Sequence, residues 1–171
     1  RVRDWLLNLV HAADSSAHIE PTGLIPEAPT LRPADIFSQA ALPGTQAALD
    51  IGIMSPDATG AGDDCCEAMY QKKMSDYAPY LRSLNRQGIR YKPLTFSCYG
   101  RVHPEALATL TAIAKQTARR RGLPGHEGIL RRTLAGVTVE IWKRAAAMVR
   151  ACLPRDSVEE HSLLMGVDTG R

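Results

Sequence analysis

The sequence is poor in aromatic side chains and has no long hydrophobic run. Only two phenylalanines and two tryptophans occur among 171 residues. Hydrophobic residues still make up 44% of the chain and charged residues 23%, which is typical of a globular domain and argues against disorder. No apolar stretch approaches the roughly 18 residues of a membrane-spanning helix. We therefore expect a folded protein without a membrane partner.

Cysteine is also scarce, and its spacing excludes common cysteine-based sites. The sequence has four cysteines and no C-x-x-C pair, so a structural zinc site is not indicated. The neighbouring Cys65 and Cys66 would form a disulfide only with strain, so we expect reduced thiols. Reduced thiols favour an intracellular protein, nuclear if it is eukaryotic. The opening "RVRDWLLNLV" predicts an amphipathic helix rather than a signal peptide, and the missing initiator Met suggests a piece of a longer polypeptide.

Positive charge is concentrated in one part of the chain. Residues 101–152 carry ten Lys or Arg against three Glu, whereas the formal net charge of the whole chain is +3. Such a distribution is typical of a surface that contacts a polyanion, and a solvated helical face has the same pattern.

Hydrophobic periodicity predicts an α/β protein. Spacing indicates helices over 2–14, from Asp63 or Asp64 to Gly88, 103–121 and 129–152. We expect Pro79 to kink or split the second of these helices. Strands are predicted near Ile19 and over 33–37, 46–54 and 89–98. The elements predict a mixed four-stranded sheet flanked by helices, in one domain over 1–152 with its core over about 1–121 and basic C-terminal helices over 103–152. Residues 153–171 are predicted to form a flexible tail.

Two aspartates occupy apolar strands on either side of a predicted turn. Asp35 and Asp50 are separated by 14 residues, the length of two strands and the turn "LPGTQ". Two carboxylates at one end of a sheet repel each other unless a cation lies between them. Mg²⁺ is commonly held by one or two carboxylates together with a substrate phosphate. Lys73, on the helix that follows, is the candidate base or electrostatic stabiliser.

These residues carry a resemblance to a known family. The segments "RPADI…ALDIGIMSP…KKMSDYAPYL…YKPLTFSCYG" resemble the restriction-like endonuclease domain of non-LTR retrotransposons, a branch of the PD-(D/E)XK nuclease superfamily. The likeness covers about residues 20–120. It implies an α-β-β-β-α-β core, here with two added C-terminal helices, and metal-dependent nicking of DNA. It also implies that the remainder of a retroelement polyprotein is a partner.

The resemblance implies roles for individual residues. Asp35 and Asp50 would hold Mg²⁺ or Mn²⁺, Lys73 would orient or activate water, and Glu20 is a possible third acid. The residues expected to contact nucleic acid are Arg32, Lys72, Arg119, Arg120, Arg121, Arg131 and Arg132.

Three positions differ from the family pattern. Ala34 is inserted between Pro33 and the first acid, Gly52 stands where many superfamily members carry lysine, and Asp76 replaces the second lysine of K-x-x-K-Y. Lys72 is an alternative to Lys73. These departures keep open a second hypothesis, in which the same fold has lost catalysis and serves as a DNA-binding or protein-interaction module. A third hypothesis is a helical protein-binding adaptor built on residues 103–152.

Overall fold

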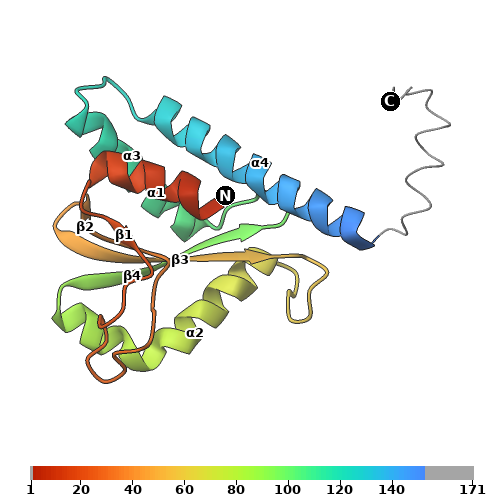
Figure 1. Cartoon of the computed structure of the whole chain (residues 1–171), viewed down its shortest axis with the longest axis horizontal. Helices are drawn as coiled ribbons and strands as arrows, with labels where there is room; N and C mark the ends of the chain where they lie inside the picture. Colours follow the sequence, from red (N-terminus) through yellow and green to blue (C-terminus); the bar gives the residue numbers. More distant parts are fainter. Residues whose placement is uncertain (1, 153–171) are drawn as a thin grey trace, which may run out of the picture.

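The computed structural model describes residues 2–152, which form four helices and four strands. The elements are α1 (Val2–Ala13), β1 (His18–Ile19), β2 (Ile36–Leu42), β3 (Thr45–Met54), α2 (Cys65–Arg86), β4 (Ile89–Ser97), α3 (Pro104–Arg120) and α4 (Glu127–Cys152). The sheet forms a middle layer, with α1, α3 and α4 on one face and α2 on the other (Figure 1). The predicted α/β class and the α-β-β-β-α-β order with two added helices are confirmed.

The sheet is mixed, and its strand order follows the chain. β1, β2 and β3 are antiparallel neighbours, while β4 runs parallel to β3. The β2–β3 turn contains Gly44 at φ +69°, a conformation that glycine adopts without steric cost. Parallel strands need a long crossover, and α2 provides it between β3 and β4. Pro93 in β4 is compatible with the sheet because β4 is an edge strand.

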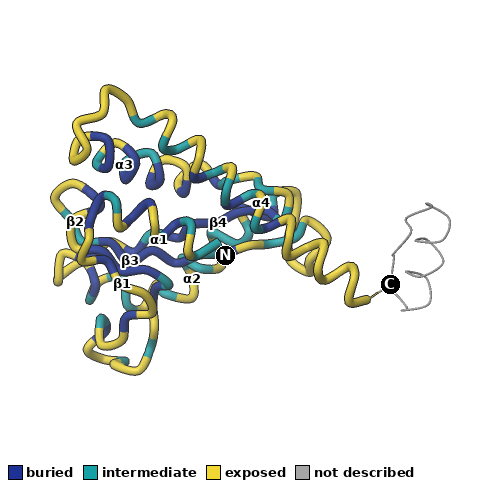
Figure 2. Tube along the Cα trace, turned by 45° about the horizontal axis from the view of Figure 1, so that its top comes forward, coloured by how far each residue is buried: buried dark blue, intermediate teal, exposed yellow. Residues whose placement is uncertain are grey.

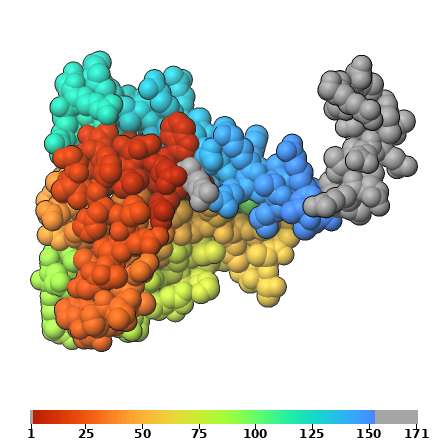
Figure 3. Space-filling view, viewed as in Figure 1, coloured from red at the N-terminus to blue at the C-terminus, as the bar shows by residue number. Residues whose placement is uncertain are grey.

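Each face of the sheet buries its own apolar cluster. On one side, Leu49 and Phe96 pack with buried residues of α1, α3 and α4 such as Leu6, Leu110 and Val137. On the other side, the buried residues are Ile25, Ala34, Phe37, Ala48, Leu84, Ile89 and Tyr91. Ala34, the inserted residue, is therefore part of the α2-side core. The segment between β1 and β2, drawn orange in Figure 3, covers this side of the molecule.

β2 differs from the prediction at both ends. It runs from Ile36 to Leu42 rather than over 33–37, with a register irregularity between Ser38 and Leu42. Asp14 explains how the polar part of this strand stays ordered. Its Oδ2 accepts hydrogen bonds from the Ser38 hydroxyl at 2.6 Å and from the Gln39 and Ala40 N–H groups at 2.8 and 2.9 Å. Asp14 directly follows α1 and precedes Ser38 by 24 residues in the sequence. Sequence periodicity does not detect such a distant partner.

α2 begins as predicted and continues through its proline. The Asp64 side chain accepts from the Cys66 and Glu67 N–H groups, which makes Asp64 the N-cap. The helix continues past Pro79, so the expectation that this proline splits it is wrong. A proline frees the carbonyl four residues earlier, and here that carbonyl belongs to Ser75, an exposed residue.

His103 is the N-cap of α3, as its position before Pro104 predicts. Its Nδ1 accepts from the Glu105 N–H at 3.2 Å, and its Nε2 lies 2.7 Å from Oε2 of Glu67. The imidazole is buried and stacks on Tyr70 with ring centroids 4.3 Å apart. His103 therefore joins α2 to α3 and has a structural role.

α4 begins at Glu127, two residues before the predicted start, and its C-terminal part extends beyond the body of the protein (Figure 2). Residues 142–152 are all exposed. Among the described helices, none has the length and apolar character that crossing a membrane requires. The flexible tail predicted for 153–171 lies outside the described residues.

Candidate active site

Asp50 is a buried carboxylate on the α2 face of the sheet. In β3, Ala48 belongs to the α2-side core and Leu49 to the opposite core, so strand alternation places Asp50 and Gly52 toward α2. Asp50 is only 9% exposed. A buried carboxylate is unfavourable unless it is paired and hydrogen-bonded.

Lys73 supplies the charge partner. Its Nζ lies 2.7 Å from Oδ2 of Asp50, and the two side chains are 17% and 12% exposed. A Cβ atom at Gly52 would lie 2.6 Å from Cε of Lys73 and 2.8 Å from Cγ of Met69. The lysine side chain therefore passes directly over Gly52. The helix supplies an ammonium next to the strand position that carries lysine in many members of the superfamily described above.

Tyr91 is a second partner of the same oxygen, and no feature of the sequence predicted this role. Its hydroxyl donates to Oδ2 of Asp50 at 2.5 Å. Burial and then the hydrogen bond to Asp50 raise the pKa of Tyr91, so the phenol stays protonated. The ring of Tyr77 lies against that of Tyr91, with centroids 4.7 Å apart. Burial, followed by the charges of Asp50, Asp76 and Asp35, raises the pKa of Tyr77.

Asp35 lies just before β2 and contacts β3 on either side of Asp50. Its N–H donates to the carbonyl of Leu49 at 2.9 Å, and its Oδ2 accepts from the N–H of Ile51 at 2.7 Å. The two acids are therefore held on adjacent segments of chain, as the strand-turn-strand pattern predicts. Asp35 also lines a surface cavity of about 340 Å³ together with Arg3, Asp4, Ile51 and Arg144.

The two acids have the donor chemistry that a magnesium ion requires. Both acids make side-chain contacts through Oδ2: that of Asp35 accepts from the Ile51 N–H, and that of Asp50 contacts Lys73 and Tyr91. The described residues contain no cluster of three or more His, Cys, Asp or Glu suited to a metal. Mg²⁺ does not need such a cage, because it often binds one or two carboxylates and takes its remaining oxygens from water and phosphate. These oxygens are of the kind that Mg²⁺ binds, although the two side chains have different surroundings: Asp50 points toward α2, whereas Asp35 lines the cavity formed with Arg3 of α1 and Arg144 of α4.

Glu20, the possible third acid, is paired with two arginines. Its Oε1 accepts from Arg3 at 2.5 Å and its Oε2 from Arg32 at 2.8 Å, so both oxygens are engaged by arginine. Glu20 is the one non-glycine residue with positive φ, +47°, in the described part of the chain. Through these pairs Glu20 links α1 to the loop before β2, and the roles of Glu20 as an acid and of Arg32 as a phosphate contact stay predictions.

The structure also separates Lys72 from Lys73. Lys72 forms an exposed ion pair with Asp76 at 2.8 Å, one turn along α2. Only Lys73 reaches Asp50, which decides between the two lysines. The charge of Asp76, which departs from the family pattern, is neutralised by its neighbour.

The predicted arginine cluster lies on the other side of the sheet from Lys73. Arg119 and Arg120 end α3, Arg121 follows it, and Arg131 and Arg132 belong to the first turns of α4. Arg120 donates to the carbonyl of Ala13 and so caps the end of α1. The arginines beside Asp35 are instead Arg3 and Arg144. The sequence predicted neither arginine as part of the site, because no local pattern relates α1 to the distant helix α4.

Comparison of the chain with protein-family models, with curated proteins and with solved structures gives no match.

Proposed function

We propose that this protein is a Mg²⁺-dependent DNA endonuclease whose active site comprises Asp35, Asp50 and Lys73. The observation that carries the proposal is the 2.7 Å contact between Lys73 and Asp50 across Gly52, beside a second acid. A strand acid, a neighbouring acid and a lysine are the parts that the family resemblance requires. That resemblance further suggests nicking of target DNA within a longer retroelement polyprotein.

The side chains have distinct roles in this proposal. Asp35 and Asp50 would hold the ion, while Lys73 and Tyr91 fix Asp50 through Oδ2. When bound, Mg²⁺ supplies activation of water and stabilisation of charge on the phosphodiester. Lys73 adds a positive charge in a largely dehydrated position, where electrostatic stabilisation is stronger than in water. Tyr91 keeps its proton and prevents rotation of the Asp50 carboxylate.

Two arginines would hold the substrate, Arg144 directly and Arg3 once it releases Glu20. Arg3 and Arg144 line the cavity that contains Asp35, and they come from α1 and α4 on the same side of the sheet. Guanidinium groups bind phosphate oxygens bidentately. Phosphate contacts position a duplex without reading its sequence, so these residues would orient the backbone at the acids. The binding should weaken as salt concentration rises.

The test is nicking of supercoiled plasmid with Mg²⁺, with EDTA as the metal-free control. We expect Asp50→Asn, Asp35→Asn and Lys73→Met to lose nicking by about 100-fold or more, the scale on which a preorganised electrostatic contact contributes to catalysis. Lys72→Met is the matched control, because it removes the adjacent lysine from an exposed pair and should leave the rate within about threefold of wild type. Equal rates in Lys72→Met and Lys73→Met would contradict the proposal.

A second candidate is a DNA-binding module that no longer cleaves. It is favoured by the Lys73–Asp50–Tyr91 network, which already satisfies the buried acid without a metal. In that case the wild-type protein would shift duplex DNA in a gel in a salt-dependent manner and would nick no plasmid with Mg²⁺ or Mn²⁺. Loss of binding in an Arg3→Gln, Arg144→Gln double variant would show that the DNA surface is the one described above.

A further inference from the structure

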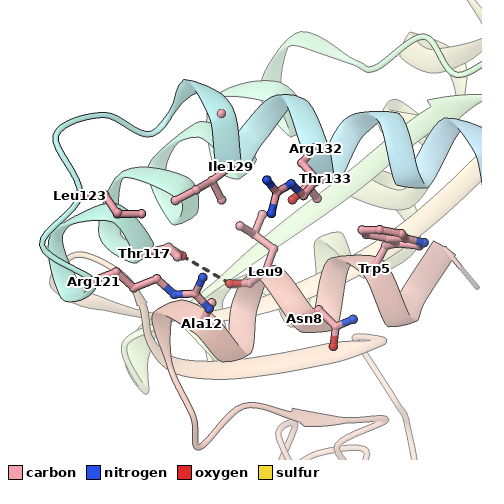
Figure 4. A pocket seen from close by; sticks show the side chains of 11 residues that line it. Trp5, Asn8, Leu9, Ala12, Thr117, Arg121, Leu123, Ile129, Arg132 and Thr133 are labelled. Atoms are coloured by element: carbon pink, nitrogen blue, oxygen red, sulfur yellow. Dashed lines mark hydrogen bonds between the residues drawn. The ribbon is translucent and has the colours of Figure 1, made fainter.

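A second cavity lies in the helical layer, on the other side of the sheet from Lys73 and Asp50. It has a volume of about 300 Å³ and opens between α1, the end of α3 and the start of α4 (Figure 4). This volume is at the lower end of the range for small-molecule sites. The residues that bear on its chemistry are Trp5, Asn8, Leu9, Arg121, Ile129 and Arg132.

The charged groups at this cavity are all positive. Arg121 approaches from the end of α3 and Arg132 from α4, and both side chains extend toward the space beside Leu9 (Figure 4). No Asp or Glu lines the cavity. Within residues 2–152, neither guanidinium takes part in an ion pair or side-chain hydrogen bond. Two guanidiniums without an acid are electrostatically suited to one anionic group.

The rest of the lining is largely apolar. Leu9 is buried, and Trp5 and Ile129 are partly buried in the same core. Trp5 is held in place by α4, since a Cβ atom at Gly136 would lie 2.5 Å from Cδ2 of its indole ring. The indole and the two aliphatic side chains therefore supply a preformed apolar part of the lining. A site with one charged end and one apolar wall fits an amphiphilic ligand better than it fits a bare ion.

We propose that this cavity binds a small organic anion. Its carboxylate or phosphate lies between Arg121 and Arg132, and its apolar body lies against Trp5, Leu9 and Ile129. The proposal does not depend on nuclease activity, because none of these residues touches Asp35, Asp50 or Lys73. It assigns part of the arginine cluster to a ligand site instead of to a nucleic-acid backbone.

Trp5 makes the test direct, because a ligand in the cavity would change its fluorescence. In the full chain carrying Trp142→Phe, Trp5 is the single tryptophan. We would titrate octanoate as the probe and compare it with octanol, which has the same chain without the charge, and with inorganic phosphate, which has the charge without the chain. The expected result is saturable binding of octanoate, with octanol and inorganic phosphate each at least about tenfold weaker.

Substitutions identify the residues responsible. Arg121→Gln and Arg132→Gln should each weaken octanoate binding about tenfold, the effect of losing one charge-assisted hydrogen bond. Arg131→Gln and Arg119→Gln are the matched controls, since neither residue lines the cavity, and they should bind as wild type does. Thermal unfolding of each variant would verify that it folds.

Three results would overturn the proposal. One is equal binding of octanoate and octanol, and another is equal affinity in Arg132→Gln and Arg131→Gln. The third is absence of octanoate binding together with loss of duplex-DNA binding in Arg121→Gln and Arg132→Gln, which would assign the cluster to nucleic acid. Octanoate affinity should be unchanged in Asp50→Asn, so failure of the nuclease proposal and failure of this one are distinguishable.

Discussion

Lys73 and Asp50 form an ion pair 2.7 Å long that passes over Gly52. The acid belongs to β3 and the lysine to α2, so the pair joins two elements that are consecutive in the chain and packed together. The glycine is what makes room for the lysine. A side chain at position 52 and the present path of Lys73 are mutually exclusive, because their atoms would overlap.

This geometry predicts a specific effect of Gly52→Ala. The added methyl group would fall 2.6 Å from Cε of Lys73 and should displace the ammonium from Asp50. We expect a loss of about 1–3 kcal/mol in the free energy of unfolding, typical of overpacking. Urea denaturation measures it.

A double-mutant cycle separates the lysine from other neighbours of Gly52. In a Lys73→Ala background the clash is relieved, so Gly52→Ala should cost at least about 0.5 kcal/mol less than in the wild type. In a Lys72→Ala background the cost should be unchanged. Equal costs in the three backgrounds would mean that Lys73 does not cross Gly52.

Tyr91→Phe tests the second contact of Asp50. The variant removes the hydroxyl that donates to Oδ2 and leaves the ring, which packs against Tyr77. Since hydrogen bonds to charged groups contribute about 1.5–3 kcal/mol, we expect a destabilisation of that size by chemical denaturation. Tyr80→Phe is a suitable control, because no hydrogen bond of its hydroxyl occurs among the described residues. A Tyr91→Phe variant as stable as Tyr80→Phe would refute the contact.

Asp14 makes stability dependent on pH in the acidic range. Burial acts to raise its pKa, but hydrogen bonds from Ser38, Ser16 and the Ala40 N–H outweigh it and hold the pKa well below its ordinary value. A depressed folded-state pKa stabilises the fold above the unfolded pKa, about 4, and this contribution is lost as pH falls further.

The Asp14→Asn variant should therefore be less stable than wild type at pH 7, with the difference shrinking below about pH 4. Thermal unfolding between pH 7 and pH 3 measures this convergence. Asp57→Asn provides the control, because Asp57 is exposed and contacts only Ser55 and its own loop. A constant gap between Asp14→Asn and wild type over this range would contradict the assignment.

Two glycines of α4 provide a matched test of core packing. A Cβ atom at Gly136 would lie 2.5–2.7 Å from three ring atoms of Trp5, whereas nothing lies within 4 Å of one at Gly128. An indole ring cannot move aside as a lysine tail can, so Gly136→Ala should cost about 1–3 kcal/mol. Gly128→Ala should change the free energy of unfolding by about 0.5 kcal/mol or less. Similar values for the two variants would show that α1 does not pack on α4 through Trp5.

Local sequence signals predicted the structure correctly wherever a side chain contacts its own segment of the chain. Asp64 caps α2 from the position directly before it, and His103 caps α3 in the same way. Hydrophobic periodicity also placed Asp50 within a strand and Lys73 within the helix that follows it. Where the decisive partner is distant, local signals failed. Asp14 extends β2 beyond the predicted residue 37, and Arg3 and Arg32 occupy the oxygens of Glu20.

By itself, the sequence determined the order of elements and their α/β class, because hydrophobic period and capping chemistry are properties of neighbouring residues. Only the tertiary structure decided which lysine meets Asp50, that Tyr91 shares its oxygen, and that Arg3 and Arg144 rather than the arginine cluster lie beside Asp35. Those relationships depend on which faces of α1, α2 and α4 pack toward the sheet. Moving one residue along a helix turns the side chain by about 100°, which is enough to exchange a buried contact for an exposed one.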